Sequence, residues 1–160
     1  MHNFDLPNLG SKEENYKVLI KQIESLIEGE TNIVAIMANI SAAINETFNF
    51  LWVGFYLAKN NKLILGPFQG PVACFSINKN EGVCGASWEQ KKTIIVPDVN
   101  RFPGHIACSN YSKSEIVLPI FKNKKTFGLL DIDSSTKNTF DQIDKNYLEK
   151  IIKLMELKLI

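Results

Sequence analysis

The sequence predicts an α+β domain in which an antiparallel sheet of about six strands carries helices mainly on one face. Amphipathic stretches with apolar residues spaced three and four apart lie at both ends of the chain. Between them are short runs of branched and aromatic residues, and polar turns join several of these runs. A chain of 160 residues is expected to form a single domain over residues 1–160, with residues 1–10 as a loose lead-in.

Two helices are expected at the N-terminal end and one at the C-terminal end. Residues 11–14, SKEE, fit a capping box, and Thr31 or Asn32 can cap the second helix. The third helix is expected to be capped within TFDQ, residues 139–142. Each of these segments has one apolar stripe, so three helices can bury one face each against the sheet.

Strands are expected where apolar runs are short and rich in β-branched or aromatic residues. Asn60 and Asn61 form the turn of a first hairpin, and residues 122–125 form a later turn. Residues 85–92, GASWEQKK, can hold one or two helical turns after a flexible passage of small residues, and residues 100–114 form a long loop of the kind that is often functional. The expected strand sequences are LWVGFYLA, KLILGPF, PVACFSI, TIIVPDV, EIVLPIF and FGLLDID.

Composition and charge exclude several classes of function. Lys and Arg total 18 against 17 Asp and Glu, a net charge of +1, which provides no general attraction for nucleic acid or anionic lipid. No apolar run approaches the roughly 20 residues that a membrane helix needs, and the N-terminus does not resemble a signal peptide. We therefore expect no nucleic-acid partner, no membrane partner and a cytoplasmic location.

The three cysteines are candidates for thiol chemistry. Cys74 lies in an apolar run, where a thiol is commonly core filler. Cys84 and Cys108 lie among small residues, Cys84 near the start of the expected short helix and Cys108 three residues after His105. A helix N-terminus and a nearby cation are the usual devices that stabilise a thiolate. The chain has two histidines and no CxxC spacing, so no metal site is expected.

Acidic and aromatic side chains suggest a pocket on one face of the sheet. Asp131 and Asp133 are two apart in a strand and so share a face, and Glu115 opens the preceding strand. Converging acids can hold an ammonium group or keep one carboxyl protonated as a proton donor. Capping of loops and exposure to solvent are the plainer alternatives. Trp52 and Tyr56 also share a face, and they either belong to the core or wall the pocket.

These segments together resemble a known family. The ordered motifs GPFQGPVAC, GVCG, VPDV, FPGHIAC, SEIVLP and LLDIDS resemble those of the free methionine-(R)-sulfoxide reductases, which are stand-alone GAF-type domains. The match covers roughly residues 50–136, and it includes all three cysteines. The resemblance implies a GAF-like fold and reduction of free L-methionine-(R)-sulfoxide to L-methionine.

The resemblance also assigns roles to the thiols. It implies that Cys108 attacks the sulfoxide sulfur and becomes a sulfenic acid, which Cys74 converts to a disulfide. Cys84 can resolve the sulfenic acid instead or pass the oxidation outward. An external dithiol reductant, thioredoxin or a similar protein, restores the thiols, and no bound cofactor is implied. A homodimer is expected, with the first helices as candidate contacts.

The pocket of the family corresponds to Trp52, Tyr56, Glu115, Asp131 and Asp133. The resemblance implies that the acids hold the free amino group and polarise or protonate the S=O oxygen, while the aromatic rings surround the methyl-sulfoxide end. Two alternatives remain at this point. One is a GAF-type sensor that binds a small molecule without turnover, and the other is a thiol redox sensor that acts on a partner.

Overall fold

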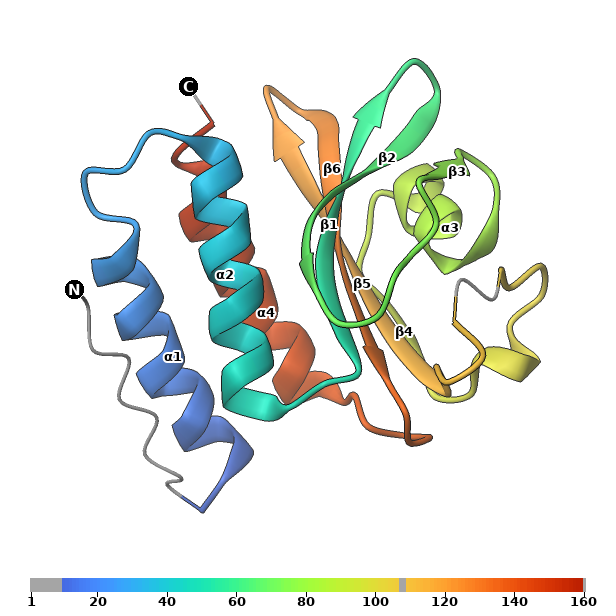
Figure 1. Ribbon diagram of the computed structural model, residues 1–160, viewed down its shortest axis with the longest axis horizontal. Helices are drawn as coiled ribbons and strands as arrows, with labels where there is room; N and C mark the ends of the chain where they lie inside the picture. Colours follow the sequence, from blue (N-terminus) through green and yellow to red (C-terminus); the bar gives the residue numbers. More distant parts are fainter. Residues whose placement is uncertain (1–9, 107–108, 160) are drawn as a thin grey trace.

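The structure is a computed structural model that describes residues 10–106 and 109–159. In this part of the chain, six strands form one sheet in the order β3-β2-β1-β6-β5-β4, and each pair of neighbours is antiparallel. Three long helices cover one face of the sheet, and the short helix α3 lies on the other (Figure 1). The predicted α+β class and the arrangement of helices mainly on one face are confirmed.

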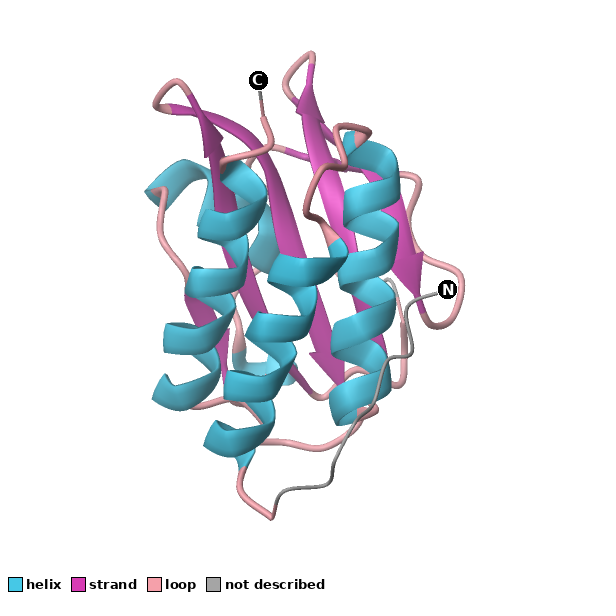
Figure 2. Ribbon diagram, turned by 90° about the vertical axis from the view of Figure 1, so that its left-hand side faces the viewer, coloured by secondary structure: helices cyan, strands magenta, loops and turns pink. Residues whose placement is uncertain are grey.

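The helical layer consists of α1 (Lys12–Leu26), α2 (Ile33–Phe48) and α4 (Gln142–Glu156), which lie side by side in Figure 2. Asn32 caps α2 by accepting hydrogen bonds from two backbone N–H groups, as the sequence predicts. The cap of α4 lies within TFDQ as predicted, because Asp141 is the N-cap residue of the helix and forms the capping box. Asp141 is suited to this position because its carboxylate accepts hydrogen bonds from two backbone N–H groups of the first turn.

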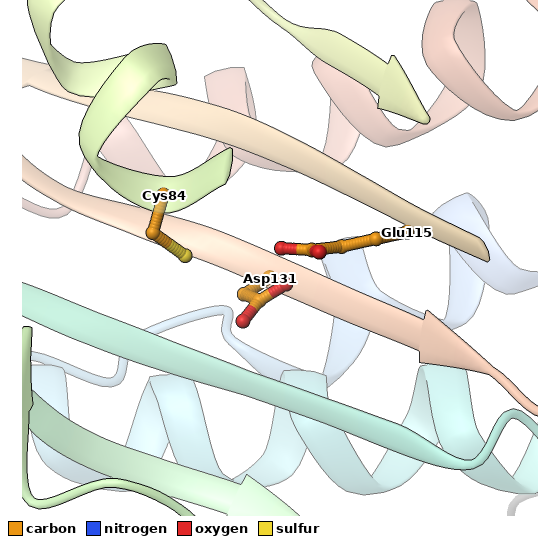
Figure 3. A group of neighbouring side chains, drawn as sticks. All are labelled: Cys84, Glu115 and Asp131. Carbon is orange, nitrogen blue, oxygen red and sulfur yellow. The ribbon is translucent and has the colours of Figure 1, made fainter. Parts of the chain in front are cut away.

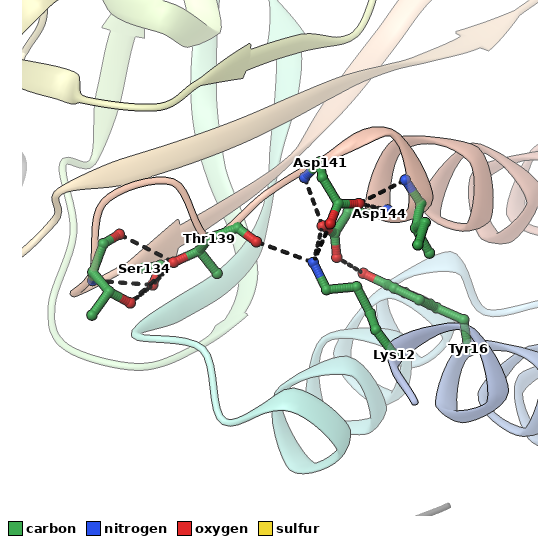
Figure 4. A network of polar contacts seen from close by, with 8 residues as sticks. Lys12, Tyr16, Ser134, Thr139, Asp141 and Asp144 are labelled. Atoms are coloured by element: carbon green, nitrogen blue, oxygen red, sulfur yellow. Dashed lines mark hydrogen bonds and ion pairs between the residues drawn. The ribbon is translucent and has the colours of Figure 1, made fainter. Parts of the chain in front are cut away.

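A polar network joins the first helix to the last (Figure 4). The buried Asp144 of α4 accepts a hydrogen bond of 2.8 Å from the Tyr16 hydroxyl and pairs with Lys12 Nζ at 2.6 Å. Lys12 also donates to the carbonyl oxygen of Thr139 and contacts Asp141. The ends of the described chain are therefore held together by a buried charge with several partners.

Four long strands form the centre of the sheet, the short strands β3 and β4 lie at its edges, and tight turns join several of the strands. Asn60 and Asn61 both have positive φ, at 50° and 61°, which suits a two-residue hairpin turn. No helix among the described residues is both long and apolar enough to cross a membrane. The strands are β1 (Trp52–Lys59), β2 (Lys62–Gln69), β3 (Ser76–Asn78), β4 (Ile94–Val96), β5 (Ser114–Lys122) and β6 (Lys125–Ser134).

The predicted third strand, PVACFSI, is wrong over most of its length. β3 comprises only Ser76–Asn78, while residues 71–75 form a loop that leaves the sheet. Gly70 has φ of 127°, a conformation that turns the chain and that other residues rarely adopt. Pro71 follows and has no N–H to donate to a neighbouring strand. Polar side chains of β1 bind the loop instead.

The two faces of the sheet bury different clusters because side chains alternate along each strand. Val53 and Phe55 of β1 pack with the three long helices in the larger core. Trp52 and Tyr56 face the other way and pack with residues of α3 in a smaller cluster. The larger core holds the fold together, whereas the smaller cluster leaves room for polar groups between the sheet and α3.

Candidate functional site

A cavity lies on the face of the sheet opposite the long helices. It encloses about 590 Å³ measured out to its open mouth. The sheet forms its floor, and α3 (Gly82–Gln90) and the loops before α3 and β5 form its walls. Its lining includes the predicted residues Trp52, Tyr56, Cys84, Glu115, Asp131 and Asp133, and also His105 and Ser112.

Three acids meet on the floor of this cavity, as their spacing predicts. Glu115 of β5 lies directly opposite Asp133 of β6 in the sheet register, and Asp131 is two residues earlier on the same face. Glu115 is 5% exposed and Asp131 is 7% exposed. The alternative in which these acids cap loops or face solvent is therefore wrong for Glu115 and Asp131.

Burial changes the ionisation of these acids. Loss of hydration raises the pKa of Glu115 and of Asp131 well above the usual range, and the negative charge of neighbouring carboxylates raises both further. Burial also raises the pKa of Asp133 to about 6, against the opposing effect of a hydrogen bond from Ser112. The cluster can therefore retain protons near neutral pH and donate one to a bound molecule.

Cys84 brings sulfur to the same cluster. It is the third residue of α3, and its side chain points toward Glu115 and Asp131 (Figure 3). Its position near a helix N-terminus is as predicted, but the expected activation is opposed. Burial raises the pKa of the Cys84 thiol well above its ordinary value, and the charges of Asp131 and Glu115 raise it further. Cys84 is accordingly a buried free thiol.

Cys74 belongs to a loop beside the cavity. Cys74 lies in the loop of residues 71–75, its backbone carbonyl accepts a hydrogen bond from Tyr56, and it is disulfide-bonded. It is not the core filler of a strand that the apolar run indicates, because the strand begins only at Ser76. Cys108 lies outside the described residues.

Trp52 and Tyr56 form an aromatic wall and also hold a loop. Their ring centroids are 5.9 Å apart in a stacked arrangement. The indole Nε1 of Trp52 donates to the carbonyl oxygen of Pro71 at 3.1 Å, and the Tyr56 hydroxyl donates to that of Cys74 at 3.0 Å. Both hydrogen bonds satisfy backbone oxygens of the loop that has left the sheet.

His105 is near the acids but is not a permanent cation. Its Nδ1 lies 3.9 Å from Glu115 Oε2, which is beyond hydrogen-bond distance. Burial lowers the pKa of His105 below its ordinary value, so the neutral imidazole predominates near neutral pH. The lowered pKa of His105 therefore does not support the idea that a protonated His105 stabilises a thiolate at Cys108.

Two residues of the site are missed by the sequence reasoning. Ser112 donates a short hydrogen bond to Asp133, and nothing in its local sequence indicates this contact. Gly54 lies opposite Asp131 in the register, and a Cβ there would fall 2.4 Å from the Trp52 ring and from Phe68 Cβ. A glycine inside a strand is a recognised sign of such close approach.

Comparisons with known proteins agree with this architecture. A family model for the GAF domain matches residues 30–157. The chain is 58% identical over 148 residues to GAF domain-containing protein A of Dictyostelium discoideum, with 92% of this chain and 94% of that protein covered. It is 45% identical over 166 residues to the free methionine-R-sulfoxide reductase of Saccharomyces cerevisiae, with 96% and 92% covered.

A solved structure extends the similarity to three dimensions. The free methionine-R-sulfoxide reductase of Neisseria meningitidis, determined in complex with its substrate, superposes with a TM-score of 0.96 at 42% identity. The superposition covers 99% of this chain and 95% of that one.

Proposed function

Because the chain belongs to the free methionine-(R)-sulfoxide reductase family of GAF domain proteins, we propose that it reduces free L-methionine-(R)-sulfoxide to L-methionine. The observation that carries this proposal is the meeting of three carboxyl groups at one cavity, those of the buried Glu115 and Asp131 and of the half-buried Asp133. Family relatives with this activity support the substrate, and the chemistry of the cavity supports a role for each side chain.

The carboxyl groups select the amino-acid end of the substrate. Among the described residues, no Lys or Arg side chain lines the cavity, so acids outnumber potential cations there. An α-ammonium group can pair with an ionised carboxyl, and the attraction between the two charges offsets the cost of removing them from water. A methionine sulfoxide inside a polypeptide has no such group, so the free amino acid is the expected substrate. Trp52 and Tyr56 then enclose the apolar methyl-sulfoxide end.

The first chemical step forms a sulfur–oxygen bond on the enzyme. The thiolate of Cys108 attacks the sulfoxide sulfur while a protonated carboxyl of the cluster donates a proton to the sulfoxide oxygen. The oxygen is transferred to Cys108, which becomes a sulfenic acid, and the substrate leaves as methionine. A carboxyl with a raised pKa suits this role because it still holds a proton near neutral pH.

The second step removes the oxygen as water. The thiol of Cys74 attacks the sulfenic sulfur of Cys108, the hydroxyl leaves as water, and a disulfide forms. Cys74 suits this role better than Cys84 because it lies in a loop at the cavity and takes part in a disulfide. Cys84 is buried with a raised thiol pKa, which lowers its thiolate fraction. An external dithiol protein such as thioredoxin then returns both cysteines to thiols.

One assay tests the substrate and distinguishes a reductase from a sensor. The protein is incubated with a dithiol and with each sulfoxide epimer of methionine, both free and within a peptide. We expect consumption of the free R epimer alone. Binding of the free R epimer without methionine release would indicate a sensor, and reduction of the peptide form would contradict the role assigned to the carboxyl groups.

A second experiment tests the nucleophile and the resolving thiol. Cys108→Ser should abolish methionine release, whereas Cys74→Ser should still release methionine once per protein molecule in the absence of reductant. Mapping the disulfide after one turnover of the unmodified protein should find Cys74 joined to Cys108. Full turnover by Cys108→Ser, or a disulfide to Cys84, would require the roles to be reassigned.

A further inference from the structure

Three side chains of metal-binding type meet inside the cavity, and each belongs to a different element. Cys84 lies on α3, Glu115 on β5 and Asp131 on β6. The sulfur and one carboxylate oxygen from each acid all lie within 4.8 Å of one another, and all three residues are buried. Their ligand atoms face a common point in Figure 3. Because two strands and a helix position them, the group is held by rigid elements.

One oxygen of the Asp131 carboxyl group has no hydrogen-bond partner among the described residues. Asp131 is only 7% exposed, and its Oδ1 atom is buried and receives no hydrogen bond from any described residue. A buried carboxylate oxygen without a donor is costly to maintain. Since this oxygen belongs to the carboxyl group that faces Cys84 and Glu115, a cation bound among the three residues would satisfy it.

The surroundings also favour a cation. Asp133 adds a third carboxyl group to the cavity lining, and in the part of the chain that the structure describes no Lys or Arg side chain lines it. Nδ1 of His105 lies 3.9 Å from Glu115 Oε2 and, among the described groups, has no hydrogen-bond partner. It is a further nitrogen donor at the same cavity. The open mouth of the cavity provides a path for an ion to enter.

The mixture of ligands indicates which cation fits. Mg²⁺ and Ca²⁺ prefer oxygen ligands alone, whereas Zn²⁺ binds thiolate, imidazole and carboxylate in tetrahedral sites. With Zn–ligand bonds of about 2.0–2.3 Å, tetrahedral ligand atoms are about 3.3–3.8 Å apart. The three side chains would therefore have to approach one another by about 1 Å, which rotation of carboxyl groups can supply. The sequence contains no CxxC motif that would indicate such a site, because the three ligands are far apart along the chain.

We propose that Cys84, Glu115 and Asp131 bind Zn²⁺ and that the bound ion inhibits the protein by occupying the place of the substrate's ammonium group. The inhibitory part rests on the proposed function, since it assumes that Glu115 and Asp131 hold the ammonium. The binding part does not depend on any activity. Zinc acts here as a regulator that competes with substrate, and it takes no part in the reaction.

Binding is tested with Co²⁺ as a spectroscopic probe on the reduced, metal-free full chain under nitrogen. A thiolate ligand gives Co²⁺ a charge-transfer band in the near ultraviolet, which should saturate at one equivalent and disappear when Zn²⁺ is added. Cys84→Ser should remove the band, while Cys74→Ser and Cys108→Ser should retain it. Glu115→Gln should keep the band but weaken Co²⁺ binding at least tenfold. Absence of a band in the unmodified protein, or a band that survives Cys84→Ser, would overturn the proposal.

Inhibition is tested by single turnover. The protein is reduced beforehand and the reductant is removed, so that no dithiol reagent is present in solution to bind the metal. Zn²⁺ should slow methionine release at low sulfoxide concentration, and excess sulfoxide should restore the rate. Mg²⁺ at the same concentration is the control and should have no effect. A cobalt band with no methionine release in any condition would reject the proposed function and leave the metal site standing. Slowing that excess substrate does not relieve would overturn the competitive role.

Discussion

The hydroxyl of Tyr56 donates a hydrogen bond of 3.0 Å to the backbone carbonyl of Cys74, so a strand in the centre of the sheet holds the loop that carries this cysteine. Trp52, four residues earlier on β1, binds the same loop through the carbonyl of Pro71. The aromatic residues therefore serve two purposes. They line the cavity, and they keep Cys74 at its edge.

Tyr56→Phe should weaken the attachment of this loop while preserving the aromatic wall. The lost hydrogen bond is expected to lower the free energy of unfolding by about 1 kcal/mol. The rate at which the disulfide forms after one turnover should fall several-fold, because Cys74 samples more positions. Rapid-quench trapping of free thiols measures this rate. Tyr147→Phe, which removes a hydroxyl that binds Glu13 far from the cavity, should leave it unchanged, and equal rates in all three proteins would contradict the role of Tyr56.

Gly54→Ala should disturb the aromatic wall directly. The added Cβ would lie 2.4 Å from both Trp52 Cη2 and Phe68 Cβ, so at least one of them must move. We expect a loss of about 1–3 kcal/mol in the free energy of unfolding and a raised KM. Urea unfolding and steady-state kinetics measure the two effects. Combining the change with Trp52→Phe should recover part of the stability, and a loss as large as in the single variant would show that the indole contact is not responsible.

Asp133→Asn should change how stability depends on pH. The pKa of Asp133 is about 6 in the folded protein against 3.8 for the ordinary carboxyl. The folded state therefore retains a proton that the unfolded state releases, and stability due to this group is present below pH 3.8 and is lost as pH rises through about 6. Relative to the unmodified protein, the variant should gain up to about 3 kcal/mol between pH 4 and pH 7.

Urea unfolding across this pH range measures the effect, and Asp98→Asn provides a control of opposite sign. The hydrogen bond from Lys137 lowers the pKa of Asp98, so the stability due to Asp98 is present above the ordinary carboxyl pKa and is lost as pH falls. Asp98→Asn should therefore lose stability at neutral pH. A difference between Asp133→Asn and the unmodified protein that is constant with pH would contradict the assignment.

Asp144→Asn should destabilise the fold without changing the cavity. Asp144 is fully buried and is bound by Lys12 and Tyr16 of α1. Neutralising it leaves the Lys12 ammonium short of a partner, and we expect a loss of about 3–5 kcal/mol. Thermal or urea unfolding measures it. The control is Glu13→Gln, which removes an exposed charge from α1, the helix that carries Lys12 and Tyr16. KM should stay unchanged, and a raised KM in Asp144→Asn would show that the network also shapes the site.

Much of the fold follows from local sequence. Alternation of side chains along the strands is enough to put Glu115, Asp131 and Asp133 on one face, because adjacent antiparallel strands share their faces in register. Asn32 is predicted as a cap because its side chain can reach the free N–H groups of its own helix. Such features depend on residues only a few positions apart or on the strict period of a strand.

Other features require contacts between distant segments. PVACFSI has the composition of a strand, yet the carbonyls of Pro71 and Cys74 accept hydrogen bonds from side chains of β1, and regular pairing with β2 begins only near Phe75. The helix N-terminus predicts an activated Cys84, but packing against the sheet buries the thiol beside carboxylates that oppose its ionisation. The close approach of Cys84 to Glu115 and Asp131 depends on how α3 docks, which no spacing along the chain records.

Local sequence is enough to predict most of the elements, the faces of the strands and the candidate residues for chemistry. Only the folded chain shows which of these residues meet and how deeply each is buried, and burial in turn shifts their pKa values. The physical reason is that secondary structure and alternation are governed by short-range backbone geometry. The pKa of a carboxyl or thiol is instead governed by hydration and by charges brought close from other parts of the chain.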